Sequence, residues 1–381
     1  MKPLSWLILA LSVVSAALSA AEPPFAPPPP PAQDLPHAGV RLCLPECLTP
    51  QWVSGEDEVL RAVLWEAGQP VKSLTLSMVK INDKESVEEL ADRMGQRVEG
   101  DLADLVVLKK TPMAVAGIEG SARLLRYRRG GQNLMAARVC FIRQFQEPKL
   151  RVCYVLEVEA AADREAKILP ILGQVIKTLT LVPLQHPSAP TEADLGPPCR
   201  DTAGGYRIRP PRHWRLTLPP PATRPSDTGI QMAQVDHLLG GQETLSASVI
   251  LTDVPAAMDA ETYARNAVQA AAKVAAKDEA SVRLLSQGAA KMGGLAGWQF
   301  VIERKGSASA SGPPVLIAQR TVCEAGEAGR RRSFTLILVC RGQSPQAVTQ
   351  AIDALAGGFE LETPTTQPAT KPATLPATAP K

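Results

Sequence analysis

Residues 39–45 read GVRLCLP and residues 205–211 read GYRIRPP, so one pattern of glycine, apolar residue, arginine, apolar residue and proline occurs twice. The offset is 166 residues between Gly39 and Gly205, and it rises to 180 between Leu181 and Leu361. An offset that grows slowly indicates one domain plan in two copies, with small loop insertions in the second. The duplication therefore defines the fold before any single motif does.

Length and composition agree with two domains. A chain of 381 residues suggests two domains of ordinary size, each long enough to bury a core. Hydrophobic residues make up 45% of the chain but aromatic residues only 4%, so the cores must be aliphatic. A formal charge of +3 excludes a general polyanion binder.

The chain divides into six segments. Residues 1–21 are typical of a signal peptide, with Lys2, an apolar run from Trp6 and small residues at the cleavage site. A membrane anchor is the alternative, but the run is short for a span, and no transmembrane segment is expected after cleavage. The following segments are a Pro-rich linker at 22–37, a domain at 38–184, a linker at 185–198, a domain at 199–362 and a disordered Pro/Ala/Thr-rich tail at 363–381.

Each copy shows the same order of elements. Alternating apolar residues predict strands, and Ser86 with Glu89 forms a capping box that starts a helix. Short connections between successive strands favour antiparallel pairing. Pro170 interrupts the apolar stripe of the closing helix in copy one, so that helix is expected to begin late or to kink. The predicted strands are 59–65, 74–81, 122–128, 136–145 and 150–158 in copy one, and 230–235, 245–252, 298–304, 315–322 and 334–339 in copy two.

The chain resembles the PsbP-like superfamily, which includes a Ran-binding nuclear import factor and bacterial envelope proteins. Copy one departs from the pattern at Leu48, where copy two has Trp214. The resemblance implies an α+β fold of two tandem α/β/α sandwich domains, each with a mainly antiparallel sheet flanked by helices, and it implies no catalytic residues. The residues that carry it are Gly205, Tyr206, Arg207, Ile208, Pro211, Trp214, the Gly293 to Gly297 entry to a long strand, and Phe359.

No motif for catalysis, metal binding or cofactor binding is evident. The four histidines lack zinc-ligand spacing, and Cys43 and Cys47 form one isolated pair without histidine partners. Phosphate-loop and Gly-x-Ser-x-Gly motifs are absent from the sequence. We therefore expect no enzyme activity, no cofactor and no metal.

A disulfide between Cys140 and Cys153 is predicted. Seven cysteines in an exported protein meet an oxidising compartment. With a turn at Gln146 and Glu147, Phe145 faces Pro148 and the two cysteines lie directly opposite each other, within disulfide range. The alternative is a longer turn that shifts the register and leaves both as buried thiols.

Two arginine clusters suggest an anionic partner. Arg126, Arg128 and Arg129 belong to one basic strand, and Arg330, Arg331 and Arg332 lie between two strands of copy two. They fit lipid headgroups, polysaccharide or an acidic protein; the alternative is a solvated strand edge that resists aggregation. Nucleic acid is disfavoured by export and by the near-balanced charge.

These observations favour a secreted or periplasmic, non-enzymatic protein that binds or scaffolds a partner in the cell envelope. Its partner would be an unknown envelope protein or an anionic surface. The alternative is a carrier or sensor of a small apolar or lipid-like ligand. A large apolar pocket would favour the carrier, and a flat apolar patch the partner-binding protein.

Overall fold

The structure, a computed structural model, describes residues 32–53, 55, 57–66, 69–81, 85–97, 103–146, 150–218, 228–236, 242–306, 313–325 and 329–362. It forms two compact units. The first runs to Ser188 and includes Arg212–Arg215 and Ala233–Thr244; the second holds Ala189–Pro211, Leu216–Met232 and the chain from Leu245. The predicted signal peptide and Pro/Ala/Thr-rich tail lie outside the described residues.

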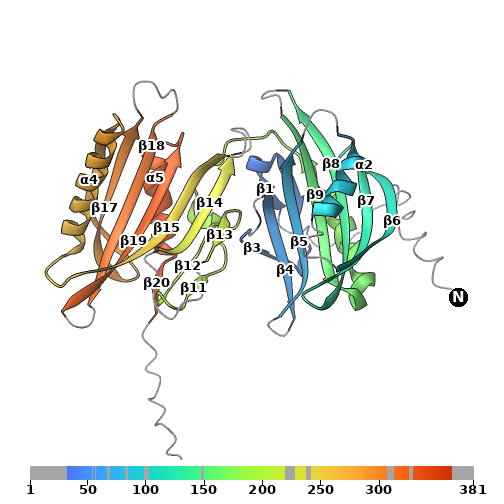
Figure 1. The fold of residues 1–381 in the computed structure, drawn as a ribbon, viewed down its shortest axis with the longest axis horizontal. Coiled ribbons are helices and arrows are strands. Elements are labelled where there is room, and N and C mark those ends of the chain that lie inside the picture. The colour runs from blue at the N-terminus through green and yellow to red at the C-terminus, as the bar shows by residue number, and fades with distance from the viewer. Residues whose placement is uncertain are drawn as a thin grey trace, which may run out of the picture. The chain divides into compact units, whose positions relative to one another are not determined.

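A seven-stranded antiparallel sheet forms most of the first unit (Figure 1). Its edges are β3 and β6, and its centre is β9, which pairs with β5 and β8. In spatial order the strands are β3 (Thr49–Gln51), β4 (Glu58–Glu66), β5 (Gln69–Lys80), β9 (Leu150–Ala161), β8 (Gln132–Phe145), β7 (Ile118–Arg129) and β6 (Ala103–Val115).

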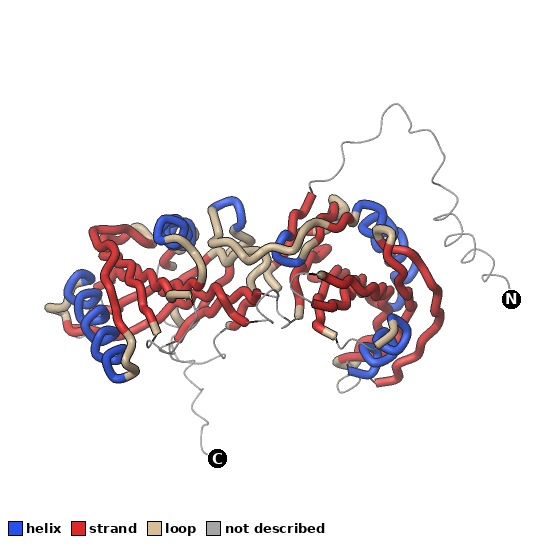
Figure 2. Tube along the Cα trace, turned by 90° about the horizontal axis from the view of Figure 1, so that it is seen from above, coloured by secondary structure: helices blue, strands red, loops and turns tan. Residues whose placement is uncertain are grey.

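Helices cover both faces of this sheet, because alternate side chains of each strand point to opposite faces. Helix α3 (Ile168–Thr178) packs on β8 and β9, and its apolar residues join Leu74, Leu76 and Met78 in the main core. On the other face, α2 (Val87–Arg97) packs on β7 and β8. Figure 2 shows helices on both sides of the curved sheet.

The opening GVRLCLP stretch forms a second, three-stranded sheet. Here β2 (Val40–Cys43) pairs with β1 (Ala32–Leu35) and with β10 (Thr180–Leu181). The Tyr154 hydroxyl of β9 donates to the Ala38 carbonyl at 2.6 Å and so ties the opening segment to the main sheet. The last residues of the predicted Pro-rich linker therefore belong to the folded unit, because they form β1, which pairs with β2. The proline-rich composition of this segment does not indicate that strand.

The second seven-stranded sheet repeats this order with antiparallel pairs. Helix α4 (Ala260–Lys277) packs on β16, β17 and β18, and α5 (Pro345–Gly357) on β18 and β19. A small sheet joins β11 (Cys199–Asp201), β12 (Tyr206–Ile208) and β20 (Glu360–Leu361). The large sheet consists of β13 (Arg215–Thr217), β14 (Thr228–Asp236), β15 (Gln242–Pro255), β19 (Arg330–Arg341), β18 (Val315–Ala325), β17 (Leu295–Lys305) and β16 (Ser281–Met292).

The predicted fold class is confirmed, and so are several local details. Each sheet carries helices, and the strands pair antiparallel. The capping box is present, with the Glu89 N–H donating to Ser86 Oγ and the Ser86 N–H to the Glu89 carboxylate. Helix α3 begins at Ile168, the first residue of the predicted apolar stripe, so the expected late start is wrong; Pro170 is its third residue and lies in the first turn, where no intrahelical N–H bond is lost. The long edge strands β6 and β16, which follow α2 and α4, were not predicted, and neither were the short strands β1, β3, β11 and β13.

Candidate binding surfaces

Strand β6 exposes three consecutive apolar side chains. Val106, Val107 and Leu108 are 44%, 40% and 41% exposed. Val106 lies opposite Arg126 and Val107 opposite Leu125, so the two valines point to different faces of the sheet. We name these three residues the β6 strip.

The edge of β6 resists pairing with a further strand. Its register shifts between Ala103 and Val106 and again between Val107 and Lys109, and such bulges disturb the hydrogen-bonding edge. Pro112 removes one backbone donor from the regular part of the strand. A partner of the β6 strip would therefore contact its side chains rather than extend the sheet.

The arginines of the first cluster lie on two faces of β7. Arg126 and Arg128 are exposed and lie opposite β6, on the face to which Val106 of the β6 strip points. Arg128 lies 3.8 Å from Asp104, an exposed and therefore weak ion pair. Arg129 points to the other face and pairs with Glu159. Only Arg126 and Arg128 thus adjoin the exposed apolar residues.

The second arginine cluster is already engaged within its own unit. Arg330 lies 3.7 Å from Asp253, and Arg332 donates to Glu324 at 2.9 Å while its guanidinium lies 4.6 Å from the centre of the Phe334 ring. Arg331 lies on the opposite face of β19 from these two. All three residues belong to β19, an interior strand between β15 and β18. An anionic partner for this cluster stays a prediction.

Charged residues on the outer face of the first sheet are paired and largely buried. Arg138 donates to Glu157 on the neighbouring strand at 2.6 Å, and Arg123 donates to the Glu88 carbonyl and to Asp92 of α2. The Tyr127 hydroxyl donates to Glu159; burial, together with the nearby carboxylates, raises the pKa of Tyr127. The contacts of Arg123 attach α2 to the sheet, and those of Arg138 and Tyr127 join neighbouring parts of the sheet.

The register of β8 and β9 differs from the prediction. Phe145 pairs with Leu150, so the turn is longer than assumed. Cys140 therefore lies opposite Val155, and Cys153 lies opposite Ile142, which makes the cysteines diagonal neighbours on one face. Both are buried, and a hydrogen bond with Cys153 lowers the pKa of the Cys140 thiol, with help from Arg138 and Arg123.

The structure contains no disulfide. Diagonal neighbours lie about 7–8 Å apart at Cα, beyond the usual disulfide range, so closing this bond requires strand movement. The Cys140–Cys153 disulfide stays a prediction. Cys43 is half-buried and Cys47 is exposed, and neither has metal-ligand neighbours in the described chain.

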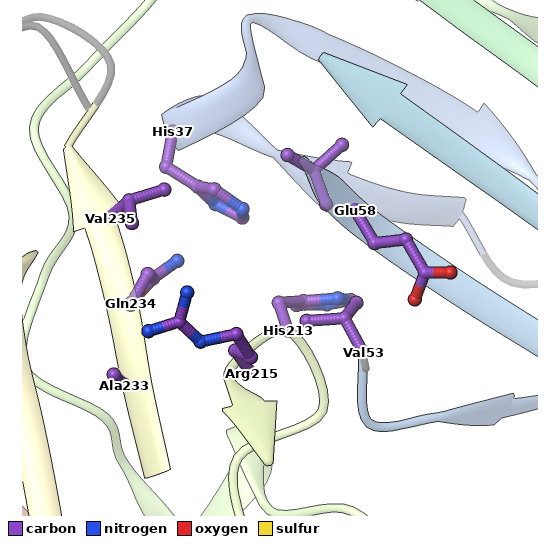
Figure 3. Close-up of a pocket in the computed structure, with 9 residues that line it drawn as sticks. His37, Val53, Glu58, His213, Arg215, Ala233, Gln234 and Val235 are labelled. Carbon is purple, nitrogen blue, oxygen red and sulfur yellow. The ribbon is translucent and has the colours of Figure 1, made fainter. Parts of the chain in front are cut away.

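A small cavity lies within the first unit. It has a volume of about 10 Å³, which is room for about one water molecule. Figure 3 shows its nine lining residues, which are His37, Val53, Glu58, Val59, His213, Arg215, Ala233, Gln234 and Val235. The mixed lining and the volume do not suit an apolar ligand.

Metal-binding groups and membrane-spanning helices can be assessed for the residues that the structure describes. No group of three or more histidine, cysteine, aspartate or glutamate side chains is placed to hold a metal ion. None of the helices combines the length and apolar character needed to cross a membrane.

No protein-family model matches the chain, and no curated protein is similar in sequence. Solved structures that are similar include LpqN of Mycobacterium tuberculosis, involved in cell envelope biogenesis (11% identity, 41% of this chain and 87% of that chain, TM-score 0.33). Cyanobacterial PsbP from Synechocystis matches at 15% identity over 44% and 93% of the chains, with a TM-score of 0.31. The Saccharomyces cerevisiae Ran-binding protein Mog1p matches at 9% identity over 40% and 95%, also at 0.31.

These neighbours have the PsbP-like and Mog1 fold that the sequence resemblance predicted. A match of greater extent is the type VI secretion immunity protein TplEi from Pseudomonas aeruginosa, with 13% identity over 83% of this chain and 97% of that one, at a TM-score of 0.26. Such low scores carry no argument about function. The fold itself rests on the strand orders and registers described above.

Proposed function

We propose that this chain is a non-enzymatic protein of the periplasm or cell surface that binds an acidic protein partner through the β6 strip. The exposure of three consecutive apolar side chains next to Arg126 and Arg128 carries the proposal. Apolar anchors with a charged rim are a common composition of protein interfaces.

Burying the β6 strip supplies a useful share of binding energy. Full burial of one such side chain is worth about 1.5–3 kcal/mol, and about two-fifths of each remains to be covered. Covering all three is therefore worth about 2–4 kcal/mol. Since 1.4 kcal/mol is tenfold in affinity, loss of the strip should weaken binding about 30-fold or more.

Three observations support the other parts of the proposal. The leader-like residues 1–21 support export. The pairing of Arg123, Arg138 and Glu157 with neighbouring groups supports a non-catalytic role, because no nucleophile and base face each other there. The carrier alternative receives no support from a cavity that has room for about one water molecule.

Site-specific photo-crosslinking tests this function. A photo-reactive amino acid at Val107 of the full-length chain, expressed in its own cells, should form a protein adduct. The adduct should weaken with Arg126→Glu and disappear with Leu108→Asp. The same probe at Trp65, which is 48% exposed on β4 near the other edge of the sheet, is the matched control.

The affinity of this chain for the captured protein should then be measured. Adducts with lipid instead of protein, or equal adducts at Val107 and Trp65, would contradict the proposal.

A further inference from the structure

The outer edge of β16 is a long strand edge without the features that protect β6. Strand β16 runs from Ser281 to Met292 at the end of the second sheet, and in the described part of the chain it pairs with β17 on one side only. Its other side therefore presents backbone N–H and C=O groups, the usual template for an added strand.

The two edges differ although they occupy the same place in the two copies. Strand β6 has two register shifts and Pro112, whereas β16 has one register shift, between Leu284 and Ser286, and no proline. From Ser286 to Met292 the ladder with β17 is unbroken. Seven residues of regular edge are enough to hold a partner strand of ordinary length.

Side chains along this edge leave room for a neighbour. Ser286, Gly288 and Ala290 are small, and a methyl group at Gly288 would meet nothing within 4 Å. Leu284 is 42% exposed on the face that carries α4, since it lies opposite Ile302 of the α4 core. An added strand would cover this apolar side chain while its backbone pairs with β16.

The charge of β16 indicates the chemistry of the partner. Its only charged side chains are Arg283 and Lys291, and both are exposed. Glu303 of β17 lies near Arg283 at 3.1 Å and Lys305 at 3.8 Å, so one carboxylate is shared by two cations. Opposite charges on paired strands stabilise pairing, and like charges oppose it.

A second copy of this chain is a poor partner for β16, because like charges on paired strands oppose pairing. Strand β16 contains no carboxylate, so no register of two paired β16 strands offers Arg283 or Lys291 an acidic partner from β16 itself. Arg283, opposite Glu303, lies on the other face from Leu284, so a strand of another protein that alternates carboxylates with apolar residues can place a carboxylate beside Arg283 and an apolar side chain beside Leu284.

We propose that β16 accepts an extended acidic segment of a partner protein as an eighth strand of the second sheet. Main-chain hydrogen bonds would supply affinity, and contacts with Arg283, Lys291 and Leu284 would select the segment. This goes beyond the β6 strip, because it uses a different unit and backbone pairing instead of side-chain packing.

Hydrogen exchange on the full-length protein tests the inference. The probe is a soluble ten-residue peptide that alternates valine and glutamate, and its control carries lysine in place of glutamate. The acidic peptide should slow amide exchange in Ser281–Met292 and leave β6 unchanged. The lysine peptide should bind at least tenfold more weakly.

Two proline variants provide the matched control. Successive backbone N–H groups of an edge strand alternate between the sheet and solvent, so one of Gln287→Pro and Gly288→Pro keeps the ladder with β17. In the variant whose melting temperature is unchanged, the protection of β16 amides from exchange by the acidic peptide should be at least tenfold smaller than in the unaltered protein. Leu108→Asp in the β6 strip should have no effect, which separates this inference from the proposed function.

Three results would overturn it. These are no protection of β16 by the acidic peptide, equal protection by both peptides, or protection that appears without peptide as the protein concentration rises. The last would identify a second copy as the occupant.

Discussion

Burial controls the ionisation of individual cysteines in this chain. Cys340 of β19 has no solvent exposure, and burial raises the pKa of its thiol to about 12. Cys199 of β11 is buried less completely, and the pKa of its thiol rises to about 11. In both cases the folded state holds the proton more tightly than the unfolded state does.

The raised pKa of Cys340 makes stability depend on pH in a defined window. Its contribution is fully present below pH 9, the ordinary thiol pKa, and is lost as pH rises toward 12. Between pH 8 and pH 10 this group should cost about 1.4 kcal/mol of unfolding free energy. Urea denaturation at both pH values should show that loss in the unaltered protein and not in Cys340→Ala. Equal losses in both proteins would contradict the prediction, since other groups titrate alike in each.

At the scale of elements, a glycine lets two strands of the second sheet approach. A methyl group at Gly297 of β17 would lie 2.1 Å from the Thr321 carbonyl oxygen of β18, far closer than atoms can pack. Backbone atoms of a paired strand cannot move aside as a side-chain tip can. This explains the glycine at the end of the Gly293 to Gly297 entry, where the sequence shows only a turn.

We predict that Gly297→Ala lowers the unfolding free energy by about 3 kcal/mol, the upper range for overpacking. Gly288→Ala on β16 is the matched control, because its methyl group meets open space and should change stability by less than about 1 kcal/mol. Thermal unfolding of both variants tests this. Similar melting temperatures would show that β17 and β18 do not pair with the described register.

At the scale of the whole molecule, the predicted boundaries of copy two enclose the strands of both its sheets. In the described part of the chain, strands β11 to β20 pair with one another within residues 199–362, and two isolated bridges, Val53 with Arg215 and Leu195 with Pro211, reach outside these bounds. Copy one differs, because its small sheet needs β1, which begins before the predicted boundary at residue 38.

Residues 199–362 produced alone should therefore unfold cooperatively, whereas residues 38–184 should be less stable than residues 32–184. Removal of β1 takes away a strand and the buried Leu35, a loss of roughly 2–5 kcal/mol by analogy with truncated core residues. Circular dichroism during urea unfolding measures both. Equal stability of the two copy-one fragments would mean that β1 contributes nothing to the fold.

The sequence by itself determined the duplication, the antiparallel α+β plan and the central strands, because alternating apolar residues and caps act locally. It predicted the Ser86–Glu89 capping box for the same reason. It missed β6 and β16, whose side chains are mostly exposed and so lack a clear alternation. Only tertiary structure decided these edges and the register that sets Cys140 opposite Val155, since strand pairing depends on turn length and on distant partners.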